Sequence, residues 1–177
     1  LRLLHERGAD LNAPAKDEVA SRPVHVAAMK GHTSTVQLLA DIKADVHARR
    51  ADGGVALHES GGKGHADTTR LLISLKADVD SQDNDGRTAC WGSAFRGQKR
   101  MITLLADAKA SVNLANQSGA TPIFAASQEG HPDTIMALVA AKASIDQQAI
   151  DGTPPIGAGA GCGHDEVVAL LAHLGAR

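Results

Sequence analysis

The sequence predicts an all-α repeat solenoid, in which short helix–turn–helix units stack side by side and hairpin loops join them. The first observation is a Gly-His pair that returns every 33 residues, with one copy reading Gly-Gln: Gly31-His32, Gly64-His65, Gly97-Gln98, Gly130-His131 and Gly163-His164. The second is a Lys-Ala pair that begins twelve residues after each of the first four glycines, at Lys43, Lys76, Lys109 and Lys142. A fixed period of this length indicates stacked repeats, each contacting only its neighbours.

The beginning of the chain reads as half a repeat. Leu3-Leu4 is in phase with Leu38-Leu39, which belongs to the second helix of the following unit. We therefore expect residues 1–12 to be a partial repeat and the chain to be a fragment of a longer protein. The loop that follows, residues 13–20, holds a two-residue surplus, because insertions in surface loops are tolerated.

The first full repeat illustrates the expected elements. A short helix is expected over 22–31, because Pro23 suits the first helical turn and Gly31 can end the helix at positive φ. A second helix is expected over 33–42, and a hairpin turn at 52–54, where glycine favours such a turn. In phase with these, the sequence predicts helices at 56–63, 66–75, 89–96, 99–108, 122–129, 132–141, 155–162 and 165–173. Further hairpin turns are expected at Asp85-Gly86, Ser118-Gly119 and Asp151-Gly152.

One repeat carries a family resemblance most clearly. The stretch 121–126, Thr-Pro-Ile-Phe-Ala-Ala, with Gly130-His131 after it, resembles the ankyrin pattern Thr-Pro-Leu-His-x-Ala-Ala followed by Gly-His. Residues 167–171 resemble the second half of that pattern. The resemblance extends over the whole chain and implies stacked helix–turn–helix units with short β-hairpin loops. The chain is then one ankyrin repeat domain, 1–177, with full repeats at about 13–47, 48–80, 81–113, 114–146 and 147–177.

The resemblance also implies roles for single positions. The motif Thr would cap each first helix through its hydroxyl group; Thr88 and Thr121 occupy that slot, whereas Arg22, Val55 and Pro154 do not. The His slot of the motif holds His25, His58, Trp91, Phe124 and Gly157. Two first helices, 56–63 and 155–162, contain interior glycines, each of which costs a helix roughly 1 kcal/mol relative to alanine. We expect these two helices to be the least stable of the stack.

Composition and motifs argue against an enzyme or a cofactor site. Six of the nine histidines fall in repeat slots, and the other three are far apart in sequence. The glycine-rich run 157–163 has Cys162 where a dinucleotide fingerprint needs glycine, and no Lys-Ser or Lys-Thr follows for a P-loop. We predict no catalytic residue, no metal and no cofactor.

Charge and cysteine usage bound the partners and the cellular setting. The net charge of −2 gives no general attraction to nucleic acid or to an anionic membrane. No stretch approaches the roughly 18 uninterrupted apolar residues of a membrane span. Cys90 and Cys162 are 72 residues apart and form no metal or disulfide pattern. We expect an intracellular, cytoplasmic protein that acts as a monomer.

A repeated position identifies the candidate binding surface. The two residues before each helix-ending glycine are Met29-Lys30, Gly62-Lys63, Phe95-Arg96 and Gln128-Glu129. The resemblance implies that such positions line a concave surface. Lys30, Lys63 and Arg96, here called the basic ridge, would then lie in a row, with Phe95 as an aromatic anchor. Arg49, Arg50 and Arg87 would add positive charge near the hairpins. An ordinary solvated face is the alternative interpretation.

The resulting hypothesis is a protein–protein interaction module or scaffold. It would bind a partner, such as an extended acidic segment, through the concave groove and the hairpin tips. The alternative is a regulatory ankyrin segment of a larger enzyme or channel. A third hypothesis is modification: Asp10-Leu11-Asn12 and Ser111-Val112-Asn113 resemble the sites of asparaginyl hydroxylation in this family, which makes Asn12 and Asn113 candidate acceptors.

Overall fold

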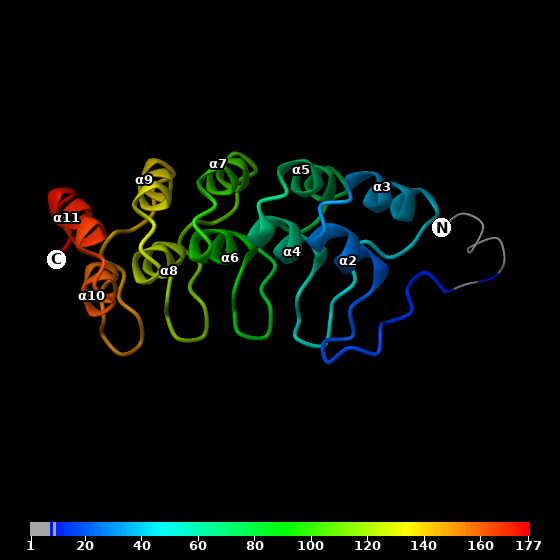
Figure 1. The fold of residues 1–177 in the computed structure, drawn as a ribbon, viewed down its shortest axis with the longest axis horizontal. Coiled ribbons are helices and arrows are strands. Elements are labelled where there is room, and N and C mark those ends of the chain that lie inside the picture. The colour runs from blue at the N-terminus through cyan, green and yellow to red at the C-terminus, as the bar shows by residue number, and fades with distance from the viewer. Residues whose placement is uncertain (1–7, 9) are drawn as a thin grey trace.

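Helix pairs stacked in a row form the whole of the described structure. The computed structural model describes Gly8 and residues 10–177, and in this part of the chain ten helices form five pairs. The first helices lie in one row: α2 (Pro23–Met29), α4 (Ala56–Lys63), α6 (Ala89–Phe95), α8 (Pro122–Gln128) and α10 (Pro155–Gly161). The second helices lie in a parallel row (Figure 1): α3 (Thr33–Asp41), α5 (Ala66–Ser74), α7 (Lys99–Asp107), α9 (Pro132–Ala140) and α11 (Asp165–His173).

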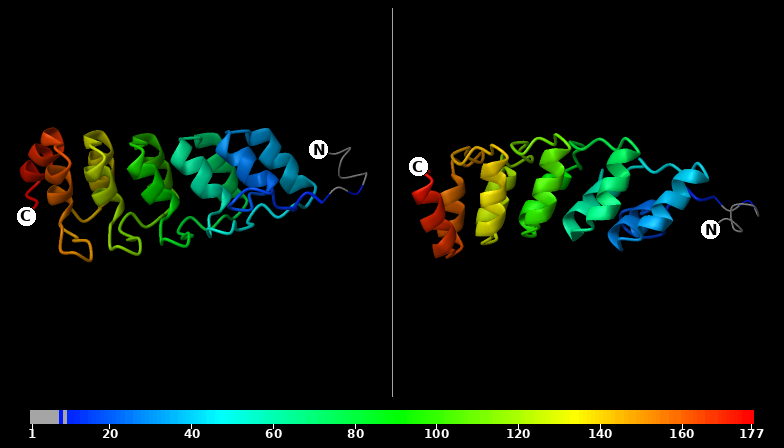
Figure 2. Two further views of the ribbon diagram at one scale, coloured as in Figure 1. Left: turned by 60° about the horizontal axis from the view of Figure 1, so that its bottom comes forward. Right: turned by 90° about the horizontal axis from the view of Figure 1, so that it is seen from above.

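The arrangement of the rows matches a repeat solenoid. Each first helix packs on the first helix of the next repeat, and each second helix on the next second helix. Figure 2 shows the pairs side by side along the rod, with the hairpin loops on one side of it. The predicted all-α solenoid is therefore confirmed, and every predicted helix in the described residues is found within one or two residues of its expected bounds.

The Gly-His turns link neighbouring repeats as well as ending helices. The five helix-ending glycines have φ between +67° and +78°, a region that favours glycine. At Gly31, an added Cβ would lie only 2.6 Å from Nδ1 of His65 in the next repeat. Nε2 of His65 lies 3.0 Å from the carbonyl oxygen of Met29, and it must donate there because a carbonyl only accepts. His131 and His164 make the same bond to Phe95 and Gln128.

The hairpin loops close as turns, but the described residues contain no β-strand. In each loop a glycine at positive φ donates to the carbonyl three residues back, as Gly86 does to Asp83. Successive loop tips share one backbone hydrogen bond, for example from Asn84 to the carbonyl of Asp52. Within one loop the two arms share only the bonds next to the turn, such as Asp83 N–H to the carbonyl of Arg87 and Gly86 N–H to that of Asp83. These are too few for a strand ladder, so the β-hairpins that the resemblance implied are hairpin turns here.

The N-termini of the first helices are stabilised by two kinds of hydrogen bond. Thr88 and Thr121 accept hydrogen bonds from the backbone N–H groups of Trp91 and Phe124, at 3.1 and 3.4 Å, as the resemblance implied. Arg22 caps nothing through its own side chain. Instead, Nδ1 of His25 accepts the backbone N–H of Arg22 at 3.0 Å, and His58 does the same for Val55 at 3.1 Å.

The partial repeat at the start is only partly described. The predicted helical residues Leu3-Leu4 lie outside the described residues. Oδ1 of Asn12 accepts the backbone N–H of Asp45, and Oδ1 of Asn113 accepts that of Ser144, both at 2.8 Å. These side chains therefore join neighbouring repeats, and their hydroxylation stays a prediction.

Candidate protein-binding surface

The basic ridge runs along the ends of the first three first helices. The side chains of Lys30, Lys63 and Arg96 are exposed. Among the described residues, no ion pair involves any of the three. Their charges are thus available to an outside carboxylate, although each exposed charge contributes little alone and is screened by salt.

An aromatic pair lies beside the end of the ridge. The rings of Trp91 and Phe95 stack with their centroids 5.4 Å apart and an interplanar angle of 12°. The guanidinium carbon of Arg87 lies 5.0 Å from the centre of the Trp91 ring, within the range of a cation–π contact. Nε1 of Trp91 also donates to the carbonyl of Ala120 at 3.0 Å. Trp91 is therefore held by internal contacts, while half-buried Phe95 extends the stack.

A cleft of about 260 Å³ lies next to this pair, between α4 and α6 and the hairpins that precede them. Its lining includes Trp91 and Phe95 from α6 and Glu59 from α4. Gly62 and Gly92 also line it, and neither has a side chain to fill the space. The guanidinium group of Arg96 reaches across α4, because an added Cβ on Gly62 would lie 3.6 Å from its Nη1 atom. Sequence positions from two repeats thus make one recess.

Arg50 lines the cleft with its charge already paired. Its guanidinium group forms ion pairs with Asp52, at 2.6 Å, and with Glu59, and the side chains of Arg50 and Glu59 are only 17% and 15% exposed. Burial alone would raise the pKa of Asp52, but hydrogen bonds from the Gly54 N–H group and from Arg50 hold that pKa below its ordinary value. Arg50 therefore shapes the wall of the cleft more than it attracts a ligand.

Arg49 is held by internal hydrogen bonds, whereas Arg87 keeps part of its side chain exposed. Arg49 donates to the carbonyls of Gly53 and Gln82 and to Oγ of Ser81, each at 2.8 Å, and so ties its own hairpin to the next. Arg87 pairs with Asp85 at 3.0 Å but keeps a 45% exposed side chain beside Trp91. Of these two predicted binding residues, Arg87 is the one left facing the cleft.

The remaining predicted residues lie on the neighbouring first helices. Met29 is half-buried at the end of α2. Gln128 is exposed at the end of α8, and half-buried Glu129 follows it. Glu129 places a negative charge at the repeat position where the preceding three units carry positive ones. The positive row thus ends at Arg96, the residue beside the cleft.

The cleft contains residues that the sequence did not single out. Glu59, Asp83 and Gly92 line it although none stood out in the repeat pattern. One signal was present: Gly62 is in phase with Phe95, so a bare backbone position precedes the largest side chain on the ridge. Only the packing of α4 on α6 shows that these positions meet.

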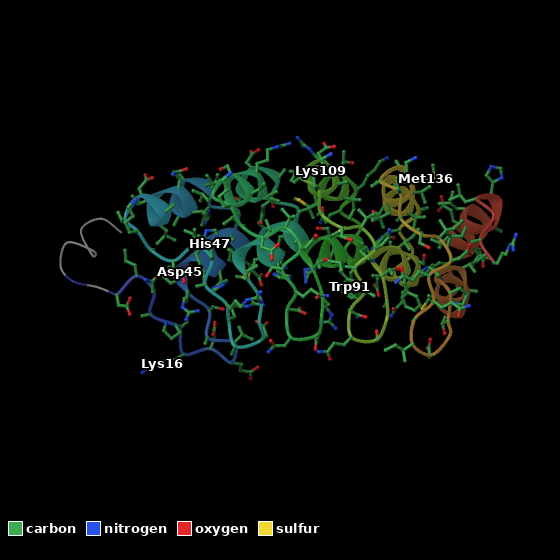
Figure 3. All side chains as sticks on the ribbon, turned by 180° about the vertical axis from the view of Figure 1, so that it is seen from behind. Lys16, Asp45, His47, Trp91, Lys109 and Met136 are labelled. Carbon is green, nitrogen blue, oxygen red and sulfur yellow. The ribbon has the colours of Figure 1, made fainter. Side chains whose placement is uncertain are left out.

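A second groove of about 600 Å³ lies on the other row, between α5 and α7. Ile73 and Leu104 line it, together with Arg70 and Arg100. Arg70 is paired with Asp67 at 3.0 Å. Figure 3 shows the separation of the two faces: Trp91 lies on the row of first helices, whereas Met136 lies on the row of second helices.

The described residues contain neither a candidate metal site nor a membrane-spanning helix. No group of three or more His, Cys, Asp or Glu residues in Gly8 and 10–177 is placed to hold a metal ion. None of the ten described helices is long and apolar enough to cross a bilayer. Burial raises the pKa of the Cys90 thiol to about 12, so this thiol stays protonated at neutral pH.

Comparison with known proteins agrees with the architecture. A family model described as ankyrin repeats (three copies) matches residues 1–83, 24–116 and 91–177. Together, these matches extend from the first residue to the last. A comparison with curated proteins finds no match to the chain.

Proposed function

Because the chain belongs to the ankyrin repeat family, whose repeats generally mediate protein–protein interaction, we propose that it is an interaction module or scaffold without catalytic activity. A partner protein binds its concave groove and its hairpin tips. The stacked repeats supply a long, rigid surface, and the variable positions on that surface supply specificity. Residues 1–177 act as a single, monomeric repeat domain. The protein is located in the cytoplasm.

One observation carries the proposal. Phe95 and Arg96 are consecutive, lie beside a cleft and end a row of exposed positive charges that pair with no described carboxylate. Aromatic residues, phenylalanine among them, and arginine are enriched at protein interfaces, and arginine is among the commonest hot-spot residues. The charge row favours an extended acidic segment over nucleic acid, because the whole chain carries a net charge of −2.

Reversal of the ridge charges tests this proposal. The partner is first captured with the full chain and identified, and its association rate is then measured at several salt concentrations. The Lys30/Lys63/Arg96→Glu variant should associate more slowly, and its rate should depend less on salt, because attraction steers the encounter.

The matched control reverses three charges on the row of second helices, as Arg70/Lys99/Arg100→Glu. It changes the net charge equally but leaves the ridge intact. If the control slows association as much as the ridge variant does, the partner responds to net charge or uses the groove between α5 and α7. Under both explanations, the basic ridge is not the binding surface.

A further inference from the structure

The size of the cleft beside Phe95 limits its occupant. Pockets that hold drug-sized ligands or cofactors have volumes of roughly 300–1,000 Å³. The cleft, at about 260 Å³, is smaller than this range and is open to the surface that carries the ridge. It has room for one large side chain of a partner protein.

The walls select the kind of side chain. Trp91 and Phe95 present a stacked aromatic wall, and aromatic rings prefer another ring in an offset or edge-to-face arrangement. The bare position Gly92, where an added Cβ would meet no atom within 4 Å, leaves the space into which such a ring can lie flat. Two carboxylates line the cleft, and both already have partners: Glu59 is paired with Arg50, and Oδ1 of Asp83 accepts the backbone N–H groups of Asp85 and Arg87.

The ridge sets the spacing of the charges that would accompany this ring. Packed helices lie about 8–10 Å apart, so Arg96, Lys63 and Lys30 recur at about that interval along the rod. An extended chain advances about 3.3 Å per residue. A partner segment that follows the ridge therefore meets one positive charge at about every third residue.

We propose that the cleft binds one aromatic side chain of an extended partner segment, whose acidic residues then recur at every third position to face Arg96, Lys63 and Lys30. This inference rests on the proposed function, since it names the partner chemistry for the same surface. The charge row alone specifies neither the cleft as a binding recess, nor an aromatic residue to fill it, nor the spacing of the acidic residues.

The test uses synthetic peptides and the full chain. One peptide has phenylalanine followed directly by glutamate, with further glutamates at every third position, and a second has the reverse order. Binding is followed by the anisotropy of a dye on the peptide and by the emission of Trp91, the only tryptophan in the chain. One of the two orders should bind and change the emission of Trp91, because the peptide ring enters the cleft beside it.

Three comparisons make the result specific. Replacing the peptide phenylalanine by alanine should weaken binding at least tenfold, and placing the glutamates at every second position should weaken it several-fold. In the protein, Gly92→Leu should also weaken binding at least tenfold. Gly92 lies within α6 with no neighbouring atom within 4 Å of an added Cβ, so leucine fills the cleft without breaking the packing.

The control variant is Gly161→Leu. Gly161 also has open space around it, but it lies in α10, two repeats beyond the cleft. Circular dichroism of both variants verifies that they are folded. Peptide binding should be unchanged in Gly161→Leu.

Two outcomes would overturn the inference. One outcome is that acidic peptides bind equally well with alanine in place of phenylalanine, and equally well to Gly92→Leu. The ridge then acts alone, and the cleft proposal fails while the proposed function stands. If neither peptide order binds at low salt, the partner chemistry is wrong. The proposed function is still judged separately by the ridge variants and the captured partner.

Discussion

Helices α4 and α10 both contain interior glycines, but they differ in what surrounds them. Helix α4 packs between α2 and α6, whereas the described first helices cover α10 on one side only, through α8 (Figure 1). An added Cβ on Gly61 of α4 would lie 3.3 Å from both Cβ of Ala89 and Oγ of Ser93 in α6. An added Cβ on Gly161 of α10 would meet no atom within 4 Å.

This difference shows that the structural role of a glycine within a helix depends on what packs against it. Gly61 permits the close approach of two helices, and Gly62 leaves room for Arg96 and the cleft. In α10, Gly159 resembles Gly61, because its added Cβ would lie 3.0 Å from Cγ1 of Val167. Gly161, by contrast, only lowers the helix propensity.

The largest effect is expected from a bulky side chain at the close contact. Gly61→Leu should lower the free energy of unfolding by about 1–3 kcal/mol, because overpacking forces α4 and α6 apart. Gly161→Leu should leave it unchanged or raise it slightly. Urea unfolding of both variants measures the difference; similar values would mean that the contact between α4 and α6 adapts freely.

Alanine separates helix propensity from packing. Gly62→Ala and Gly161→Ala should each stabilise the local helix by up to about 1 kcal/mol, since neither glycine has positive φ and both have room for a methyl group. Hydrogen exchange should locate the gain in α4 or in α10, respectively. In the parent protein, α10 should exchange faster than α4, which is covered on both sides. Slower exchange in α10 would contradict the comparison.

The ends of the following second helices differ too. After α5 the chain turns at Lys76 with φ +69°, and after α11 it turns at Gly175 with φ +88°. Left-handed backbone costs an L-residue about 1 kcal/mol that glycine avoids, although glycine loses more entropy on folding. Lys76→Gly should therefore stabilise the repeat of α4 by a few tenths of a kcal/mol up to about 1 kcal/mol, as measured by thermal unfolding.

The control for this substitution is Lys63→Gly, which also removes an exposed lysine side chain but at a position within α4. It should destabilise the protein, because glycine lowers helix propensity where the backbone is already right-handed. If both variants shift the melting temperature in the same direction, the effect comes from the lost side chain and not from the left-handed backbone.

The His slot gives the smallest effect. It holds Gly157 in α10 but a buried histidine, His25, in α2, where Nε2 bonds to the carbonyl of Ala48 at 2.9 Å. Burial lowers the pKa of His25 below its ordinary value of 6.5. The unfolded chain then binds more protons, so the stabilising contribution of neutral His25 is complete above pH 6.5 and is lost as the pH falls through the lower folded pKa.

Unfolding measured across this pH range checks the sign. The parent should lose stability on acidification, and His25→Gln should lose less over the same range. An equal loss in both proteins would assign the pH dependence to other groups.

The sequence predicted the elements well because their signals lie within single repeats. Gly31 and its equivalents had to end helices, and the turn glycines had to take positive φ. The left-handed conformation of Lys43, Lys76, Lys109 and Lys142 was not predicted, because lysine disfavours it. It ends each second helix through local backbone bonds, as where Lys43 N–H donates to the carbonyl of Ala40 and Ala44 N–H to that of Leu39. The cleft was not predicted either. Gly62 and Gly92 belong to different repeats, and their shared recess depends on how α4 packs on α6.

The affinity of the captured partner for Phe95→Ala, compared with Met136→Ala, tests the central claim most directly. Met136 is an exposed apolar residue, 45% accessible, but it lies on the row of second helices, away from half-buried Phe95 (Figure 3). Phe95→Ala should weaken binding by about 1–2 kcal/mol or more, and Met136→Ala should leave it unchanged. Parent-like affinity of Phe95→Ala, or an equal loss in Met136→Ala, would contradict binding at the surface beside the cleft.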